Sequence, residues 1–207
     1  MDPQWIRWAR ELQAIAQIGQ TFVGDNHFDR ERYVRIQQIA AEMMAAGTGL
    51  DVRAVAAFFD AEEGYATPKV DVRGVVFDGD RLLLVREASD GLWTLPGGWA
   101  DVNEAPGPAT VREVREESGF ETRAAKLLAV FDRSLHAHEP PFPYHVYKLF
   151  VRCDLVGGAA TPSHETTAVA FATEDELPPL SVSRVTEQQI RRMFDHRRHP
   201  DWPTDFD

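Results

Sequence analysis

The hydrophobic period of the chain changes from helical to strand-like between Gly64 and Pro68. Upstream of this junction, apolar residues recur every three or four positions, as in an amphipathic helix. The first such stripe consists of Trp5, Trp8, Leu12, Ile15 and Ile18. Downstream, valines alternate with charged residues from Lys69 onward, a pattern typical of a strand. We therefore expect a small all-α domain at residues 1–66 and an α+β domain at residues 67–207.

Helix and strand signals fill both parts of the chain. The first helix is expected to stop at Gly19, a second is predicted at Asp29–Ala46, and a third has Asp51 as its N-cap. In the second part, strands are predicted within 69–77, 81–87, 121–134, 144–158 and 166–172, and a closing helix within 183–198. The tail at 199–207 contains two prolines and is expected to be irregular.

Composition narrows the class of function. The formal net charge of −11 argues against a basic surface for nucleic acid, so we expect no stable nucleic-acid complex. A single cysteine, Cys153, excludes an internal disulfide and fits a reducing compartment. The N-terminal stretch lacks the hydrophobic region of a signal peptide, and no apolar run is long enough for a membrane span. We expect a cytoplasmic, soluble protein with no membrane partner.

A predicted helix from Pro106 to Ser118 carries a group of carboxylates. Glu113, Glu116 and Glu117 fall within an arc of about 100° when successive residues are placed about 100° apart. Arg112 can pair with Glu116 at spacing i,i+4. Two interpretations are open: a solvated acidic face, or a set of oxygen ligands for a hard divalent cation. The opposite side, which would face the core, carries Val111, Val114 and Ser118.

The spacing around this helix distinguishes the two interpretations. Gly98 is followed after five residues by Glu104 and, after seven more, by the run REVREESGF at residues 112–120. This resembles the Nudix box, G-x5-E-x7-R-E-U-x-E-E-x-G-U with U a bulky apolar residue, and every specified position matches. A chance match in a chain of this length is on the order of one in ten million. The final glycine of the box is Gly119.

The resemblance implies a fold, a reaction and a set of site residues. The implied fold is an α/β/α sandwich with a mixed sheet, and the implied reaction is metal-dependent hydrolysis of a nucleoside diphosphate linked to another moiety. Two or more Mg²⁺ or Mn²⁺ ions would be held by Glu113, Glu116, Glu117 and the backbone carbonyl of Gly97. Arg112 would orient the glutamates. Gly98, Glu104 and Gly119 would shape the box.

The base that takes the proton from water stays open between two glutamates. One is Glu113 in the box. The other is Glu165, because the family often places an acidic residue on a late loop, although it also reads as an ordinary surface glutamate. The catalytic set implied by the resemblance is thus Arg112, Glu113, Glu117 and Glu165.

Further segments resemble one Nudix subgroup. They are the helical first domain, the junction YATPKVDVRGVVF, the run GLWTLPGGWADV and the later HVYK. The subgroup has an N-terminal helical domain and includes CDP-choline pyrophosphatase and some ADP-ribose pyrophosphatases. It implies a homodimer in which the N-terminal domains build the interface and the rim of the site.

Four more residues are candidates for substrate contact. Arg73 and Arg86 flank the predicted hairpin, Trp99 could line a base pocket, and His145 follows a proline-rich loop. Each has a plainer interpretation, as a solvated strand end or a core side chain. Two other functions are also weighed: a non-catalytic ligand-sensing Nudix domain, and a hydrolase acting on RNA ends. The complete set of box carboxylates favours the enzyme that hydrolyses CDP-choline or ADP-ribose.

Overall fold

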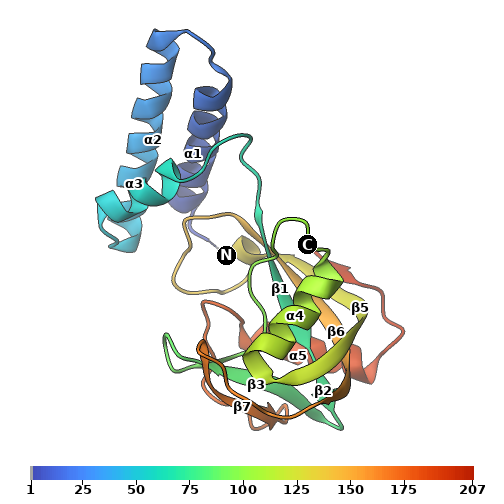
Figure 1. Ribbon diagram of the computed structural model, residues 1–207. Coiled ribbons are helices and arrows are strands. Elements are labelled where there is room, and N and C mark those ends of the chain that lie inside the picture. The colour runs from blue at the N-terminus through green and yellow to red at the C-terminus, as the bar shows by residue number, and fades with distance from the viewer. Residues whose placement is uncertain (1) are drawn as a thin grey trace. The chain divides into compact units, whose positions relative to one another are not determined.

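The computed structural model describes residues 2–207 (Figure 1). The chain forms two compact units, one made of residues up to 68 together with 139–145, the other of residues 69–138 and 146–207. We describe each unit by itself. None of the helices within the described residues is long and apolar enough to cross a bilayer.

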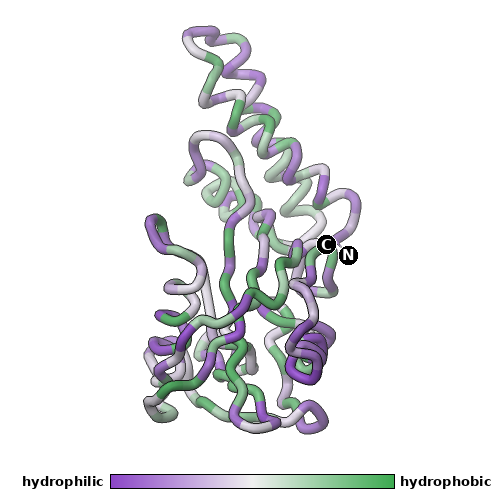
Figure 2. The backbone as a smooth tube through the Cα atoms, turned by 90° about the vertical axis from the view of Figure 1, so that its right-hand side faces the viewer, coloured by the Kyte–Doolittle hydropathy of each residue, from purple (hydrophilic) through white to green (hydrophobic). Residues whose placement is uncertain are grey.

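The first unit is a helical hairpin with a short third helix. Helix α1 spans Gln4–Phe22, α2 spans His27–Thr48 and α3 spans Val52–Asp60. Asn26 caps α2 by accepting a hydrogen bond from the Asp29 amide, and Asp51 caps α3 as predicted. Along the tube of the hairpin, short hydrophilic and hydrophobic stretches alternate (Figure 2). This is expected of amphipathic helices with one face toward a core.

Two glycines let α1 and α2 pack closely. A Cβ atom at Gly19 would lie 2.4 Å from the Tyr33 ring, and one at Gly47 would lie 2.3 Å from the Trp5 ring. The predicted helix end at Gly19 is therefore wrong: α1 continues to Phe22, because this glycine serves close packing and not termination. The core of the unit contains Ile6, Ala9, Ala40, Ala41, Met44, Val55 and Phe59.

A segment far along the chain also belongs to the helical unit. Residues Glu139–His145 group with the helices. Arg10 donates hydrogen bonds from its guanidinium to the carbonyl of Phe142, and the rings of Phe58 and Tyr144 meet edge to face with centroids 6.2 Å apart. The helical unit is thus built from two separate parts of the sequence.

The second unit contains two sheets. The first is mixed, since β1 and β6 are parallel, β6 and β5 antiparallel, and β5 and β8 parallel; in spatial order its strands are β1 (Lys69–Val75), β6 (Val146–Gly158), β5 (Phe120–Asp132) and β8 (Asp205–Phe206). The second is antiparallel and consists of β2 (Phe77–Asp78), β3 (Arg81–Glu87), β4 (Trp93–Thr94) and β7 (Thr166–Ala172), with β3 at its centre.

Helices cover the strands from two sides, which confirms the predicted α/β/α sandwich. Helix α4 (Pro106–Ser118) contributes Val114 to a core with Val76, Leu83, Val151 and Cys153. Helix α5 (Glu187–Arg198) contributes to a second core, which includes Val75, Leu82, Leu84, Phe150, Ile190 and Met193. A short 3-10 helix, η1 (Arg133–Leu135), follows β5.

The C-terminal tail differs from its prediction. It was expected to be irregular, but Asp205 and Phe206 form β8, which pairs with Ala129 and Val130 of β5. The side chain of Lys126 in β5 holds the chain that leads there, because it donates to the carbonyls of Pro200 and Trp202 at 2.7 and 2.6 Å. The two prolines precede the paired residues and so remove no donor from the ladder.

Candidate active site

Helix α4 is fixed by its ends and by its buried side. Pro106 lies in the first turn, and Gly119 ends the helix in the left-handed conformation with φ of 76°. Val114 and Ser118 are buried, as predicted. A Cβ atom at Gly74 would lie 2.3 Å from a methyl of Val114, so the glycine in β1 allows the helix to lie directly on the strand. The glutamate side of α4 is thereby held in one place.

The loop before the box runs along the edge of β1. The amides of Val72 and Gly74 donate to the carbonyls of Gly98 and Pro96, both at 2.8 Å. Between them, Gly97 has a φ of 145°, and a Cβ atom there would lie 2.0 Å from the carbonyl oxygen of Val72. Only glycine fits this position, because both the backbone angle and the space exclude a side chain.

Glu117 joins this loop to α4. The Gly97 amide donates a hydrogen bond to Oε2 of Glu117 at 2.8 Å, and the side chain is buried. Burial raises the pKa of Glu117 to about 8, even though Arg73 and the Gly97 amide act to lower it; Glu87 and Glu113 raise it further. The positive charge near Glu117 therefore does not compensate for the burial of its ionised form and for the neighbouring carboxylates.

Arg112 holds the remaining carboxylates of the box. It donates to Glu104 from Nη2 at 2.9 Å, to Glu113 from Nη1 at 2.9 Å and to Glu116 from Nη1 at 3.0 Å. The predicted i,i+4 pair with Glu116 is thus present. Hydrogen bonds to these three glutamates, chiefly Glu104, raise the pKa of Arg112 well above its usual range. Glu104 is therefore joined to the box helix through one arginine.

The donor chemistry of these residues fits a hard divalent cation. Glu113 is half-buried, and a Cβ atom at Gly98 would lie 3.2 Å from its Oε2. Burial raises the pKa of Glu113 even though Arg112 acts to lower it, whereas Glu116 is exposed. Within residues 2–207, no three Asp, Glu, His or Cys side chains are already grouped as a metal site. Arg112 donates to Glu113, and the Gly97 amide donates to Glu117.

A carboxylate that the sequence pattern did not single out lies next to the box. Glu87 ends β3, is buried, and acts electrostatically on Glu117. The strand pairing with β7 shifts between Arg86 and Glu87, and such bulges redirect side chains. Arg184 pairs with Glu87 at 3.1 Å. No spacing motif marks Glu87, because only the fold of β3 against α4 brings it there.

Arg73 lies inside the unit. It is buried and donates to Asp71 at 2.6 and 2.9 Å and to the Leu95 carbonyl at 3.2 Å. Lys148 donates to the same Asp71 at 2.6 Å. Burial acts to raise the pKa of Asp71, but the two cations outweigh it and bring that pKa down to about 2. Arg73 thus ties β1 to the loop after β4, within electrostatic reach of Glu117 and Glu87.

The other predicted contact residues lie on the surface or in the helical unit. Arg86 is exposed and donates to the Gly91 carbonyl at 2.7 Å, which braces the turn after β3. Trp99 is half-exposed beside the box loop. His145 ends the segment that belongs to the helical unit. The substrate contacts of these residues and of Arg73 stay predictions.

Glu165 has an exposed side chain on a fixed backbone. The Ala88 amide donates to its carbonyl at 2.8 Å, and its own amide donates to Ser163 Oγ at 3.1 Å. The next residue, Thr166, donates from Oγ1 to the carbonyl of Glu117 at 2.7 Å. The loop is therefore attached both to β3 and to α4, with the Glu165 carboxylate paired to His164 at 3.2 Å.

Comparison with known families agrees with this geometry. Residues 3–59 match the model described as "UDP-X-like, N-terminal oligomerisation domain", and residues 67–193 match the NUDIX domain. The second match covers more than half of the chain and includes the whole box.

Individual proteins match the whole chain or most of it. A Bacillus subtilis (strain 168) protein named "Putative ADP-ribose pyrophosphatase YjhB" is 45% identical over 207 residues, which cover 100% of this chain and 99% of the relative. A crystal structure of a UDP-X diphosphatase covers 98% of both chains at 30% identity with a TM-score of 0.64. The structure of an ADP-ribose pyrophosphatase from Streptococcus suis 89-1591 covers 68% of this chain and 100% of its own, at 40% identity with a TM-score of 0.62. The chain belongs to the Nudix family and is a Nudix pyrophosphatase with an N-terminal helical domain.

Proposed function

We propose that this protein hydrolyses the pyrophosphate bond of a nucleoside diphosphate linked to another moiety, with ADP-ribose and CDP-choline as the first substrates to test. The products are a nucleoside monophosphate and a phosphorylated small molecule. ADP-ribose is supported by the names of two similar proteins, and CDP-choline by the resemblance to the subgroup with a helical first domain.

The observation that carries the proposal is the arrangement around α4. One arginine, Arg112, bonds to Glu104, Glu113 and Glu116, while Glu117 is buried on the Gly97 amide. Burial raises the pKa of Glu113 and of Glu117, and neighbouring carboxylates raise it further, so bound cations would stabilise the ionised forms of these side chains. Carboxylates with pKa values raised in this way are typical of functional sites.

Glu113, Glu116, Glu117 and the Gly97 carbonyl would hold Mg²⁺ or Mn²⁺, in two or more sites. Divalent cations bound there neutralise the anionic oxygens of a pyrophosphate and lower the pKa of water. The chain itself supplies orientation: Arg112 keeps the carboxylates together, and the bond from Gly97 fixes the loop against the helix. Arg184, which pairs with Glu87, is a further cation of the chain beside these carboxylates and would favour an anionic substrate.

The general base stays open between Glu113 and Glu165. Glu113 lies beside Gly98 and next to the other box carboxylates. Glu165 is exposed, within electrostatic reach of Glu87, and its backbone is tied to β3. Either carboxylate can accept a proton from water once the substrate is bound.

A substrate panel tests the proposal. Purified protein is incubated with ADP-ribose, CDP-choline, several UDP-linked compounds and 5′-capped RNA, each with Mg²⁺, Mn²⁺ or EDTA, and products are separated by chromatography. With metal, we expect release of a nucleoside monophosphate from at least one compound among ADP-ribose, CDP-choline and the UDP-linked compounds. In EDTA we expect no release. Turnover of none of the nucleoside diphosphate compounds, turnover of the capped RNA alone, or equal turnover in EDTA would contradict the proposal.

A further inference from the structure

The last turn of α4 is completed by a loop from far along the chain. The final carbonyl groups of an α-helix have no partner within the helix and need one from elsewhere. In α4, the carbonyl of Glu117 accepts a hydrogen bond from Oγ1 of Thr166 at 2.7 Å, and the carbonyl of Ser118 accepts one from the amide of Thr161 at 2.9 Å. Residues 159–166, which lead from β6 into β7, therefore cap the end of the box helix.

This loop lies directly against the glycine that ends the box. A Cβ atom at Gly119 would lie 2.6 Å from the carbonyl oxygen of Ala159 and 2.7 Å from Cβ of Thr161. The left-handed backbone and the lack of space both exclude a side chain at this position. The loop is thus held against the helix end by close packing as well as by hydrogen bonds.

The hydroxyl of Thr166 also organises the turn that carries Glu165. While it donates to the Glu117 carbonyl, the same oxygen accepts a hydrogen bond from the amide of Ser163 at 3.0 Å. Oγ of Ser163 in turn accepts a hydrogen bond from the amide of Glu165 at 3.1 Å. Thr166 is only 2% exposed, so bulk water has little access to these bonds. One buried hydroxyl therefore joins the turn of Glu165 to the last turn of α4.

The two ends of this connection carry carboxylates of the proposed site. Glu117 belongs to the box, and Glu165 is one of the two candidates for the general base. Glu87 lies within electrostatic reach of both, since Glu165 acts on Glu87 and Glu87 acts on Glu117. Groups that act together in a reaction must keep their relative positions, and a displacement of about 1 Å can lower the rate about 100-fold. The bonds of Thr166 therefore fix a distance on which the reaction depends.

We infer that Thr166 is a positioning residue of the active site, whose hydroxyl holds Glu165 and the last turn of the box helix in one fixed relation. The inference rests on the proposed function, because it gives Thr166 a part in that hydrolysis. The buried side chain acts through Glu117 and Glu165 and not on the substrate itself. A side chain of the same shape without the hydroxyl would leave the Glu117 carbonyl and the Ser163 amide without this partner, and both segments would be free to shift.

Two substitutions of Thr166 in the full chain test the inference. Thr166→Val removes the hydroxyl and keeps the shape of the side chain, whereas Thr166→Ser keeps the hydroxyl. The measured quantities are kcat and KM for a compound that the wild type hydrolyses, and the affinity for Mn²⁺ without substrate, by calorimetry. In Thr166→Val we expect kcat to fall at least about tenfold with KM within about threefold, and Mn²⁺ to bind at least about threefold more weakly. Thr166→Ser should restore most of both.

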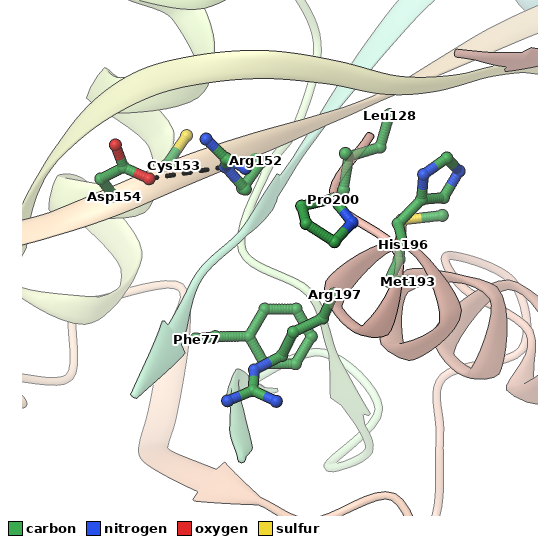
Figure 3. A pocket seen from close by; sticks show the side chains of 9 residues that line it. All are labelled: Phe77, Leu128, Arg152, Cys153, Asp154, Met193, His196, Arg197 and Pro200. Carbon is green, nitrogen blue, oxygen red and sulfur yellow. Dashed lines mark ion pairs between the residues drawn. The ribbon is translucent and has the colours of Figure 1, made fainter. Parts of the chain in front are cut away.

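Two controls separate positioning from a general loss of stability. Thr167→Val makes the same change at the next residue, whose exposed hydroxyl donates to the Arg86 carbonyl at 3.3 Å. Leu128→Val removes a methylene from the core that contains residues of α5. Figure 3 shows Leu128 among side chains none of which belongs to α4 or to residues 159–166. Leu128→Val should lower the unfolding temperature, as Thr166→Val should, but both controls should keep the kcat and the Mn²⁺ affinity of wild type.

The outcomes distinguish this inference from the proposed function. A kcat and a Mn²⁺ affinity within about twofold of wild type in folded Thr166→Val would overturn the inference, as would equal losses in Leu128→Val or no recovery in Thr166→Ser. If Thr166→Val does not fold, Ser163→Ala decides: it removes the acceptor of the Glu165 amide, so kcat should fall about threefold, and an unchanged kcat would overturn the inference. A wild type that binds Mn²⁺ but hydrolyses none of the nucleoside diphosphate compounds contradicts only the proposed function, because Mn²⁺ binding still tests Thr166.

Discussion

The backbone amide of Gly97 donates a hydrogen bond to the buried carboxylate of Glu117 at 2.8 Å. The two residues are twenty positions apart, one in the loop along β1 and the other in the last turn of α4. This contact connects the loop that would offer a backbone oxygen with the helix that would offer carboxylates. The geometry of the site therefore depends on the backbone of one residue.

Gly97→Ala should damage both stability and activity. Its φ of 145° disfavours any side chain, and the added Cβ would collide with the Val72 carbonyl at 2.0 Å. We expect destabilisation of about 2–4 kcal/mol and the loss of most activity. Urea unfolding and steady-state kinetics measure the two effects. Gly79→Ala, at a positive φ with open space around it, separates backbone strain from collision.

Glu116→Gln and Glu117→Gln should each lower kcat by on the order of 10³-fold, because each removes a charge at the proposed metal position. The fold should persist, and Glu117→Gln is expected to be at least as stable as wild type without metal, since the neutral group suits its buried position. Exposed Glu121 in β5 provides the control, Glu121→Gln. Full activity in either folded site variant would exclude the role given to α4.

Glu165→Gln should reduce kcat with little change in KM if this residue acts in the transition state. The loss should be smaller than for Glu117→Gln, because the proposed metal ligands stay. His164→Gln changes the ion-pair partner of Glu165 and serves as the neighbouring control. A kcat within about twofold of wild type, less than about 0.4 kcal/mol of barrier, would leave Glu113 as the preferred base.

The helical unit should carry the interface of a homodimer. Trp8, Ile15 and Phe22 are spaced seven residues apart on α1 and are 53%, 48% and 69% exposed. An exposed apolar stripe of this kind on a short hairpin is expected to be covered by the surface of a partner. Light scattering should show a dimer for the whole chain, and Ile15→Asp should shift it toward monomer. A fully active wild-type monomer would contradict the assignment.

His138 should make the sandwich unit sensitive to acid. Burial, and to a lesser degree Lys148, lowers the pKa of His138 to about 3, while its Nδ1 lies 2.8 Å from the Val182 carbonyl. The unfolded chain binds a proton near pH 6.5 and the folded one does not, so this stability is full above pH 6.5 and falls as pH drops toward 3. The slope for this one group is at most about 1.4 kcal/mol per pH unit.

Urea unfolding at several pH values between 7.5 and 4.5 measures this slope, and His138→Asn, which can still donate to Val182, should flatten it. An unchanged slope in the variant would assign the acid sensitivity to other groups.

The order of the elements, the bounds of α4 and the family could all be predicted from local sequence patterns. The change of period near Gly64 predicted that helices precede the strands. Helix α4 has the predicted bounds, because Pro106 and Gly119 are local signals for its start and its end. The spacing from Gly98 to Phe120 identified the family, since a loop and a helix that act together lie in one short segment. These features depend on contacts within a few residues of each other.

Other features depend on contacts between distant segments and were decided only by the tertiary structure. Glu117 is buried while Glu116 is exposed, although both belong to one helix, because the Gly97 loop lies over only one of them. Glu87 and Arg184 meet across almost half of the chain. Gly19 carries the usual signal for a helix end, yet packing against Tyr33 extends α1 beyond it, since close contact between two helices outweighs the weak preference of a single residue.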